Sequence, residues 1–182
     1  MLDAVKNGVN LVFAKKMLAH VEKLFNDGYF NKDRKFEDGT KLEPVHKFED
    51  LTTTHVVYLW VKDESVTGDK RLVDCPDTIP GLFQQADVGK PSYFISHAWM
   101  GSFKKLMTET IAFLRSASET KTFVWMDMWA VNQHRHTEEA RKQNLADVQA
   151  FDQVIEVCKA GTVVVVDAKR GNPASRLWCN YE

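Results

Sequence analysis

Cysteine, net charge and long apolar runs are all scarce in this sequence, and each shortage excludes a class of protein. Only three cysteines occur among 182 residues, and they lie far apart. An odd, scattered set suits reduced thiols in a reducing compartment better than a disulfide framework. No apolar run approaches the roughly 20 residues that span a bilayer, so we expect no membrane partner.

The balance of charge excludes a second group of functions. The formal net charge is −1, and the lysines and arginines are scattered rather than clustered. Such a chain has no strong field to attract nucleic acid. Residues 1–13 mix apolar with charged side chains, so they do not form a signal peptide. We therefore expect a cytoplasmic protein without a nucleic-acid partner.

The N-terminal part of the chain has a pattern of its own. Apolar residues recur every three or four positions and predict an amphipathic helix over residues 2–26. The polar stretch 26–50 indicates a connector. We therefore divide the chain into an N-terminal helix with its connector (1–50) and a domain (51–182). The helix either packs on the domain or serves as a linker or self-association helix.

Alternating strands and helices predict an α/β fold for the rest of the chain. A threonine cap and apolar residues favour a short helix over 52–61, although β-branched content also allows a strand. Continuous valine-rich runs are typical of a parallel sheet that is covered on both faces. The expected strands are 93–97, 122–127 and 162–167, and the expected helices are 103–114 and 137–160.

Polar or aromatic residues follow each of the three expected strands. His97 and Trp99 come at the end of the first strand, Asp127 ends the second, and Asp167 ends the third. Ligands of a parallel α/β sheet bind outside these carboxyl ends. The sequence therefore predicts a ligand site at this edge of the sheet.

A last helix, expected to follow the turn after the third strand, adds two more candidates. Trp178 and Glu182 are spaced i and i+4, so on a helix they share one face and the carboxylate rests on an aromatic wall. Together with Trp99 and Asp127 they are suited to hold a flat heterocycle and a ribose. Each also has an ordinary explanation: Trp178 as a core anchor, Glu182 as a solvated carboxylate and Asp127 as a turn or cap residue.

The remaining motifs are weaker. His134 and His136 have the spacing of a metal-binding pair, but no third ligand is evident, so a solvated loop is the favoured interpretation. No Walker sequence and no GxGxxG loop occurs. We therefore expect no metal and no phosphate loop.

Three motifs in order resemble the TIR (Toll/interleukin-receptor-like) domain, in the subgroup seen in algal and protist multidomain proteins. The resemblance covers roughly residues 92–182. The motifs are Tyr93-Phe94-Ile95-Ser96-His97, Val124-Trp125-Met126-Asp127 and Trp178-Cys179-Asn180-Tyr181-Glu182. The last of them resembles the family's Trp-Cys-x-x-Glu signature.

The resemblance implies a fold and an activity. It implies a partial flavodoxin-like three-layer sandwich with a parallel sheet. It also implies cleavage of NAD at the nicotinamide–ribose bond, in a signalling or cell-death context, with NAD as substrate and no cofactor. Glu182 matches the catalytic glutamate of the enzymatic members. His97, Trp99, Asp127 and Trp178 match positions near the bound nucleotide.

Two other functions stay open at this point. Other TIR domains are not catalytic and signal by assembling with further TIR-like domains, and in the enzymes a neighbouring copy typically completes the site. A related nucleotide-binding or nucleoside-processing domain is the third reading. Complete TIR domains have two strands after the signature helix. We therefore expect the domain to be incomplete at its C-terminus and the chain as given to have little activity.

Overall fold

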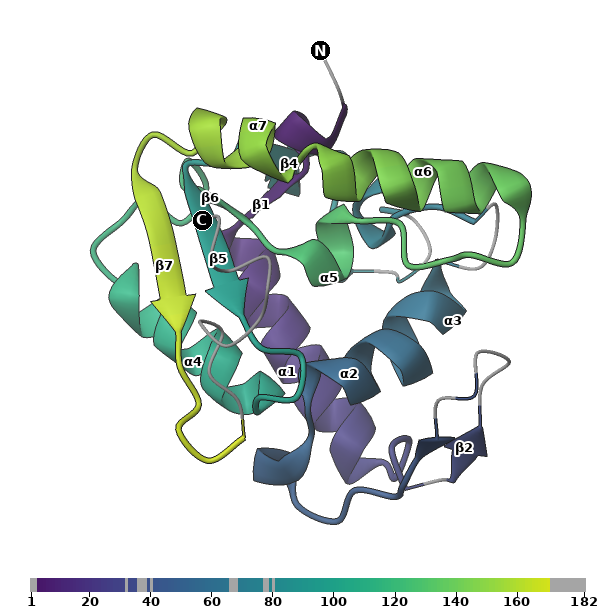
Figure 1. The fold of residues 1–182 in the computed structure, drawn as a ribbon. Helices are drawn as coiled ribbons and strands as arrows, with labels where there is room; N and C mark the ends of the chain where they lie inside the picture. Colours follow the sequence, from purple (N-terminus) through teal and green to yellow (C-terminus); the bar gives the residue numbers. More distant parts are fainter. Residues whose placement is uncertain are drawn as a thin grey trace.

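A mixed five-stranded sheet in the order β4-β1-β6-β5-β7 organises the structure (Figure 1). The computed structural model describes residues 3–31, 33–35, 39, 41–65, 69–76, 79 and 81–170. The strands are β1 (Gly8–Asn10), β4 (Val88–Gly89), β5 (Tyr93–His97), β6 (Phe123–Trp125) and β7 (Gly161–Val165). β5 pairs in parallel with β6 and β7, whereas β1 pairs antiparallel with β6 and β4. The α/β class is confirmed, with a sheet that is only partly parallel.

The N-terminal helix is shorter than its apolar periodicity predicts. A 3-10 turn, η1 (Asp3–Lys6), and strand β1 come first, and helix α1 spans Leu11–Asn26. Asn10 begins the helix because its side-chain oxygen accepts a hydrogen bond from the Phe13 amide at 2.9 Å. A Cβ on Gly8 would lie 2.9 Å from the Pro91 backbone, so this strand passes too close to its neighbour for a side chain. The prediction of a helix from residue 2 was therefore wrong over residues 8–10.

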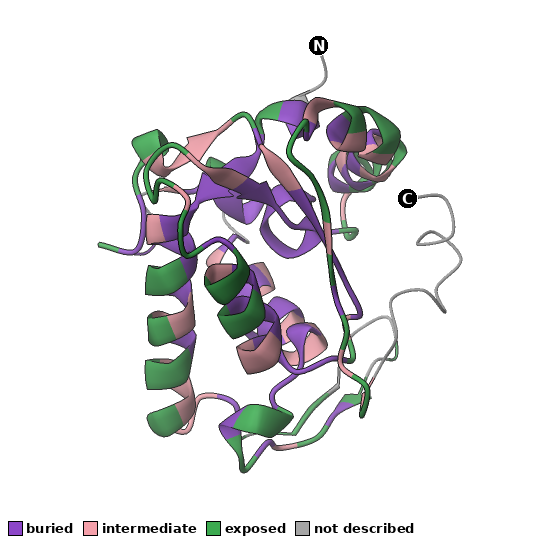
Figure 2. Ribbon diagram, turned by 90° about the vertical axis from the view of Figure 1, so that its left-hand side faces the viewer, coloured by how far each residue is buried: buried purple, intermediate pink, exposed green. Residues whose placement is uncertain are grey.

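Helix α1 belongs to the same core as the sheet. Phe13, Met17 and Val21 are fully buried, and the helix packs against α4 (Phe103–Phe113). Figure 2 shows buried positions along the strands and exposed positions on the outer sides of the helices. Residues 8–26 thus supply one strand and one packed helix to the fold that the later residues complete.

The described residues between 27 and 51 form only short elements, and a helical run follows over residues 53–64. The predicted helix over 52–61 is confirmed, and Thr52 caps it through the His55 amide. One turn of this run is a π-helix. The elements are β2 (Arg34–Lys35), β3 (Lys41–Leu42), η2 (Phe48–Asp50), α2 (Thr53–Val56), η3 (Val57–Val61) and α3 (Lys62–Glu64). Two further 3-10 turns follow, η4 (Leu72–Asp74) and η5 (Gln85–Asp87).

Helices α4 and α7 (Phe151–Val157) cover opposite faces of the parallel strands. Phe94 of β5 stacks on Trp125 and meets Phe151 of α7 at 6.1 Å between ring centroids. Tyr93, one residue earlier, meets Phe113 of α4 at 6.2 Å. Neighbouring residues of a strand point to opposite faces, so the two helices lie on the two sides of β5.

The expected helix over 137–160 is divided in two. α6 spans Glu138–Gln149 and α7 begins at Phe151, with Ala150 between them. Leu145 of α6 is 57% exposed, whereas Val154 of α7 is fully buried. A four-residue helix, α5 (Asp127–Ala130), directly follows β6. Among the residues described, no helix is long and apolar enough to cross a bilayer.

Strand β7 is less covered than its valine-rich sequence predicts. Val164 is 53% exposed, so the described part of the molecule does not bury both faces of this strand. β7 lies at the end of the strand order, beside β5 alone among the described strands. The predicted last helix, with Trp178 and Glu182, lies outside the described residues.

Candidate functional site

The carboxyl ends of β5 and β6 bring three of the predicted site residues together. His97 is the last residue of β5, and Asp127 follows β6 as the first residue of α5. Trp99 lies in the loop after β5, and its indole N–H donates to Oδ2 of Asp127 at 2.8 Å. His97 Nε2 lies 3.6 Å from the other carboxylate oxygen, Oδ1. The predicted clustering of His97, Trp99 and Asp127 is therefore found.

The loop that carries Trp99 is held by the start of α2. The amide and the hydroxyl of Thr54 both donate to the Trp99 carbonyl, at 3.0 and 3.1 Å. The Thr53 amide donates to the Gly101 carbonyl at 3.3 Å. Trp99 is half-buried, so part of its ring stays accessible while its backbone and its N–H are both fixed. Residues about 45 positions earlier thus orient this tryptophan, a contact that no local pattern reveals.

Asp167, the polar residue that follows the third predicted strand, has a structural role. Its Oδ2 accepts from the Ser102 amide at 3.0 Å, where α4 begins, and its Oδ1 accepts from the Lys169 amide at 3.2 Å. The Ser102 hydrogen bond is the main reason that the pKa of Asp167 lies below its ordinary value. The carboxylate therefore occupies the N-terminus of α4.

Two small cavities flank His97. The first lies toward α7, and the second lies between the ends of β5 and β7 and the first turn of α4. Each holds about 10 Å³, room for about one water molecule. The first is lined by Phe94, Ile95, Ser96, His97, Trp125, Asp127 and Phe151. The second is lined by His97, Ala98, Gly101, Ser102, Lys105, Leu106, Val165 and Asp167. Within the described part of the chain, neither cavity is large enough for a nucleotide, because pockets for small-molecule ligands usually measure about 300–1,000 Å³.

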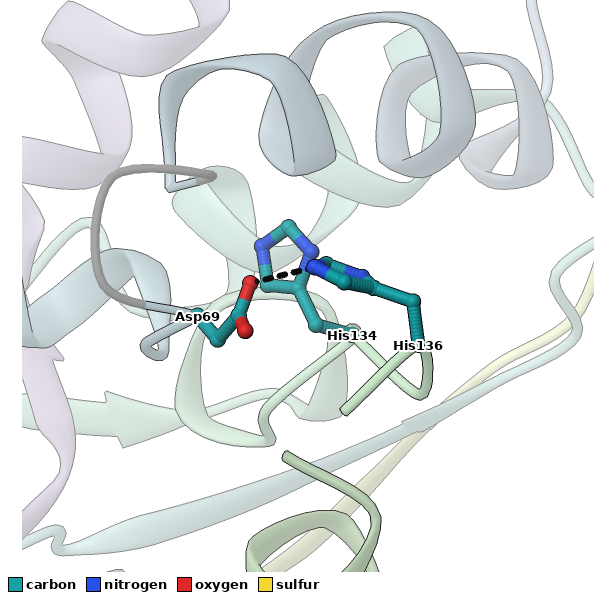
Figure 3. A group of neighbouring side chains, drawn as sticks. All are labelled: Asp69, His134 and His136. Carbon is teal, nitrogen blue, oxygen red and sulfur yellow. Dashed lines mark ion pairs between the residues drawn. The ribbon is translucent and has the colours of Figure 1, made fainter. Parts of the chain in front are cut away.

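A second polar cluster is formed by Asp69, which lies between α3 and η4, and by the loop between α5 and α6. Side chains of Asp69, His134 and His136 offer ligand atoms that all lie within 4.8 Å of one another (Figure 3). His134 is only 3% exposed, and burial lowers its pKa. The structure thus places a third candidate ligand, Asp69, beside the histidine pair, and it buries His134 while His136 stays exposed. The sequence could not show Asp69, which is 65 positions before His134.

Comparison with known proteins identified no relative of this chain. No family model, no curated protein and no solved structure matches the chain. Function must therefore be argued from the two polar clusters and from the sequence motifs.

Proposed function

We propose that this chain is a TIR-like domain that binds NAD at the carboxyl edge of its sheet and cleaves the nicotinamide–ribose bond. The convergence of His97, Trp99 and Asp127 is the observation that carries the proposal. These three residues come from two strand ends, and the sequence motifs assigned all three to a nucleotide site. Trp178 and Glu182, the other two assigned residues, lie outside the described part of the chain.

The strand order supports a ligand site at this edge. The parallel strands run β6-β5-β7, which matches the 2-1-3 start of the flavodoxin-like order. In that arrangement the chain leaves the first strand toward one neighbour and later returns on its other side. The connections then diverge over opposite faces and leave a crevice outside the strand ends. His97 lies at the carboxyl end of β5, the middle one of these three parallel strands.

Trp99 is suited to act as a stacking platform. Its half-buried ring is held by the hydrogen bond from Nε1 to Asp127 and by the backbone contacts with Thr54. A ring that is already oriented loses little conformational entropy when a flat base or nicotinamide stacks on it. Stacking of a base on an aromatic side chain contributes about 1–3 kcal/mol. In this proposal Asp127 orients the tryptophan rather than contacting the reacting bond.

The bond cleavage is assigned to Glu182. Breaking an N-glycosidic bond develops positive charge on the ribose, as in glycoside hydrolysis. A carboxylate close to that charge stabilises the transition state more than the ground state. The electron pair of the bond leaves with nicotinamide, and water then attacks the ribose carbon. The motif resemblance, rather than measured geometry, supports this role.

A non-catalytic assembly module is the second candidate, and the size of the cavities favours it. Among the residues that the structure describes, the two spaces beside His97 hold about 10 Å³ each, too little for a nucleotide. A domain that signals only by assembling with other copies needs no such pocket. In the enzymatic reading, by contrast, a neighbouring copy completes the site. Both candidates therefore involve self-association, and only turnover separates them.

The test is NAD consumption by the full-length natural protein at high concentration, where assembly is favoured. Glu182→Gln should abolish nicotinamide release while NAD still binds. Glu139→Gln, an exposed glutamate of α6, is the matched control and should keep full turnover. Absence of turnover in the unaltered protein, together with self-association, would support the assembly module instead.

A further inference from the structure

The hydrogen bonds around His134 define which ring nitrogen carries its proton. The Ser65 hydroxyl lies 2.7 Å from the Val61 carbonyl, which can only accept a hydrogen bond. The single hydroxyl proton is therefore used there. Ser65 Oγ must then accept from His134 Nε2, 2.9 Å away. His134 Nε2 bears the proton, and Nδ1 keeps the lone pair that a metal ion requires.

Asp69 is held in place by a second set of hydrogen bonds. Thr137 donates its hydroxyl to Asp69 Oδ2 at 3.1 Å, and the Asn132 amide group donates to the Asp69 carbonyl. The same Asn132 side chain accepts from the His134 amide at 2.9 Å, so one residue ties both chain segments together. Asp69 adopts φ 51°, a left-handed conformation that aspartate tolerates better than most residues.

His136 completes the cluster from the solvent side. Its Nε2 lies 2.8 Å from Asp69 Oδ1, and its side chain is 48% exposed. Figure 3 shows the Asp69 carboxylate and the His136 ring meeting beside the His134 ring. The three ligand atoms lie within 4.8 Å of one another. Tetrahedral zinc, with bonds of about 2.0–2.2 Å, places its ligands about 3.4 Å apart, so only small side-chain shifts are needed.

We propose that Asp69, His134 and His136 bind one divalent transition-metal ion, with Zn²⁺ as the preferred ion. Two imidazoles and one carboxylate suit zinc better than calcium or magnesium, which take all-oxygen sites. Three protein ligands leave a fourth position for water or an added ligand. Because His136 is half-exposed, the cluster is open to solvent on its side.

The surrounding hydrogen bonds have the pattern expected around metal ligands. Ser65 accepts a hydrogen bond from the buried histidine, and Thr137 donates one to the carboxylate. Such outer partners orient the ligands before the ion arrives. The ion would join Asp69, after α3, to the loop that precedes α6. This inference does not depend on NAD chemistry, because none of its residues belongs to the site at His97.

The experiment is a calorimetric titration of the metal-free full chain with ZnSO₄. Thermal unfolding is then measured with and without zinc. We expect one Zn²⁺ per chain and a higher Tm in the presence of zinc, because the ion binds the folded state. His136→Ala and Asp69→Asn should each weaken binding by more than about 100-fold, beyond the about 10–100-fold typical of outer partners. Asp69→Asn is informative because asparagine also tolerates the left-handed backbone.

Two further variants separate this site from non-specific zinc binding. His46→Ala removes an exposed histidine elsewhere and should leave the affinity unchanged. Ser65→Ala should weaken binding by about 10–100-fold, since it removes the acceptor that orients His134. The proposal is overturned if zinc does not bind, or if His136→Ala and Asp69→Asn bind it as tightly as the unaltered chain. Circular dichroism of each variant confirms that it is folded.

Discussion

The indole N–H of Trp99 donates to Oδ2 of Asp127 at 2.8 Å and so joins the loop after β5 to the start of α5. Asp127 is 9% exposed, and its second oxygen faces His97 Nε2 at 3.6 Å. The carboxylate is therefore held between an aromatic donor and an imidazole. The pair links the two strand ends that form the candidate site.

Trp99→Phe should destabilise the protein while keeping an aromatic ring at the site. The substitution removes the donor and leaves a largely buried carboxylate oxygen without it, which costs about 1–3 kcal/mol. Urea unfolding followed by circular dichroism measures the loss. Asp127→Asn keeps an acceptor for the indole and should lose less. Equal stability of Trp99→Phe and the unaltered protein would show that the hydrogen bond is not formed in solution.

A buried ion pair joins the segment after α3 to helix α6. Arg71 Nε and Nη2 donate to the two oxygens of Asp147, at 2.9 and 2.5 Å. The two side chains are only 7% and 2% exposed. The Asn132 amide and the Gln143 side chain also donate to Asp147, so its carboxylate is fully engaged.

Asp147→Asn should therefore be strongly destabilising. It leaves the Arg71 charge buried and without its main partner, and breaking such a pair costs about 3–5 kcal/mol. The measurement is chemical unfolding of Asp147→Asn. The control is Asp152→Asn, a substitution of an exposed aspartate of α7. If both variants unfold at the same denaturant concentration, the pair contributes little.

Stability should depend on the protonation of His55. Its Nδ1 lies 2.6 Å from the Thr52 hydroxyl and accepts from the Thr52 amide, in the cap of α2. Burial lowers the pKa of His55, and a hydrogen bond to the Glu43 backbone opposes the shift only in part. A lowered pKa means that the folded state prefers the neutral ring. Its stabilisation is complete above the ordinary pKa of 6.5 and is lost as the pH falls from there through the folded-state pKa.

His55→Asn keeps an acceptor near the Nδ1 position but cannot be protonated in this range. Its unfolding free energy should fall less steeply between pH 7 and pH 5 than that of the unaltered protein, a difference of at most about 1.4 kcal/mol per pH unit. Half-buried His20 and buried His134, whose pKa values burial also lowers, contribute to the slope as well. His46→Asn serves as an exposed control, and an identical slope in His55→Asn would contradict the prediction.

Two cysteines should resist alkylation in the folded state. Cys75 and Cys158 are both buried and free. Burial raises the pKa of both thiols, that of Cys158 to about 12. At pH 8 the thiolate fraction of Cys158 is then on the order of a thousandfold below that of an exposed cysteine. Iodoacetamide labelling with peptide mass spectrometry should show modification of both only after guanidinium is added. Rapid labelling without denaturant would mean that this part of the core opens readily.

Local patterns in the sequence predicted the central elements well. The apolar run at 93–97 forms β5, and the periodic stretch from Phe103 forms α4. The Thr52 cap likewise begins α2. These predictions succeeded because hydrogen bonds within a helix, caps and side-chain periodicity all involve residues close in sequence.

The same periodicity failed where a distant strand competed for the segment. Residues 8–10 carry a helical pattern, yet they form β1 between β4 and β6. Pairing with two strands provides hydrogen-bond partners for the backbone of residues 8–10. This stabilisation comes from residues distant in sequence, so the pattern of neighbouring residues cannot reveal it. The break at Ala150 has a similar origin, because α7 places Phe151 against Phe94 and Trp125.

The sequence by itself determined which side chains end each strand, and so named His97, Trp99 and Asp127 as neighbours at one edge. Only the tertiary structure decided how they meet, with the indole of Trp99 on Asp127 and the loop fixed by Thr54. It also brought Asp69 to the histidine pair across 65 positions. The physical reason is that order along a strand is local, whereas contacts between loops depend on how the whole core packs.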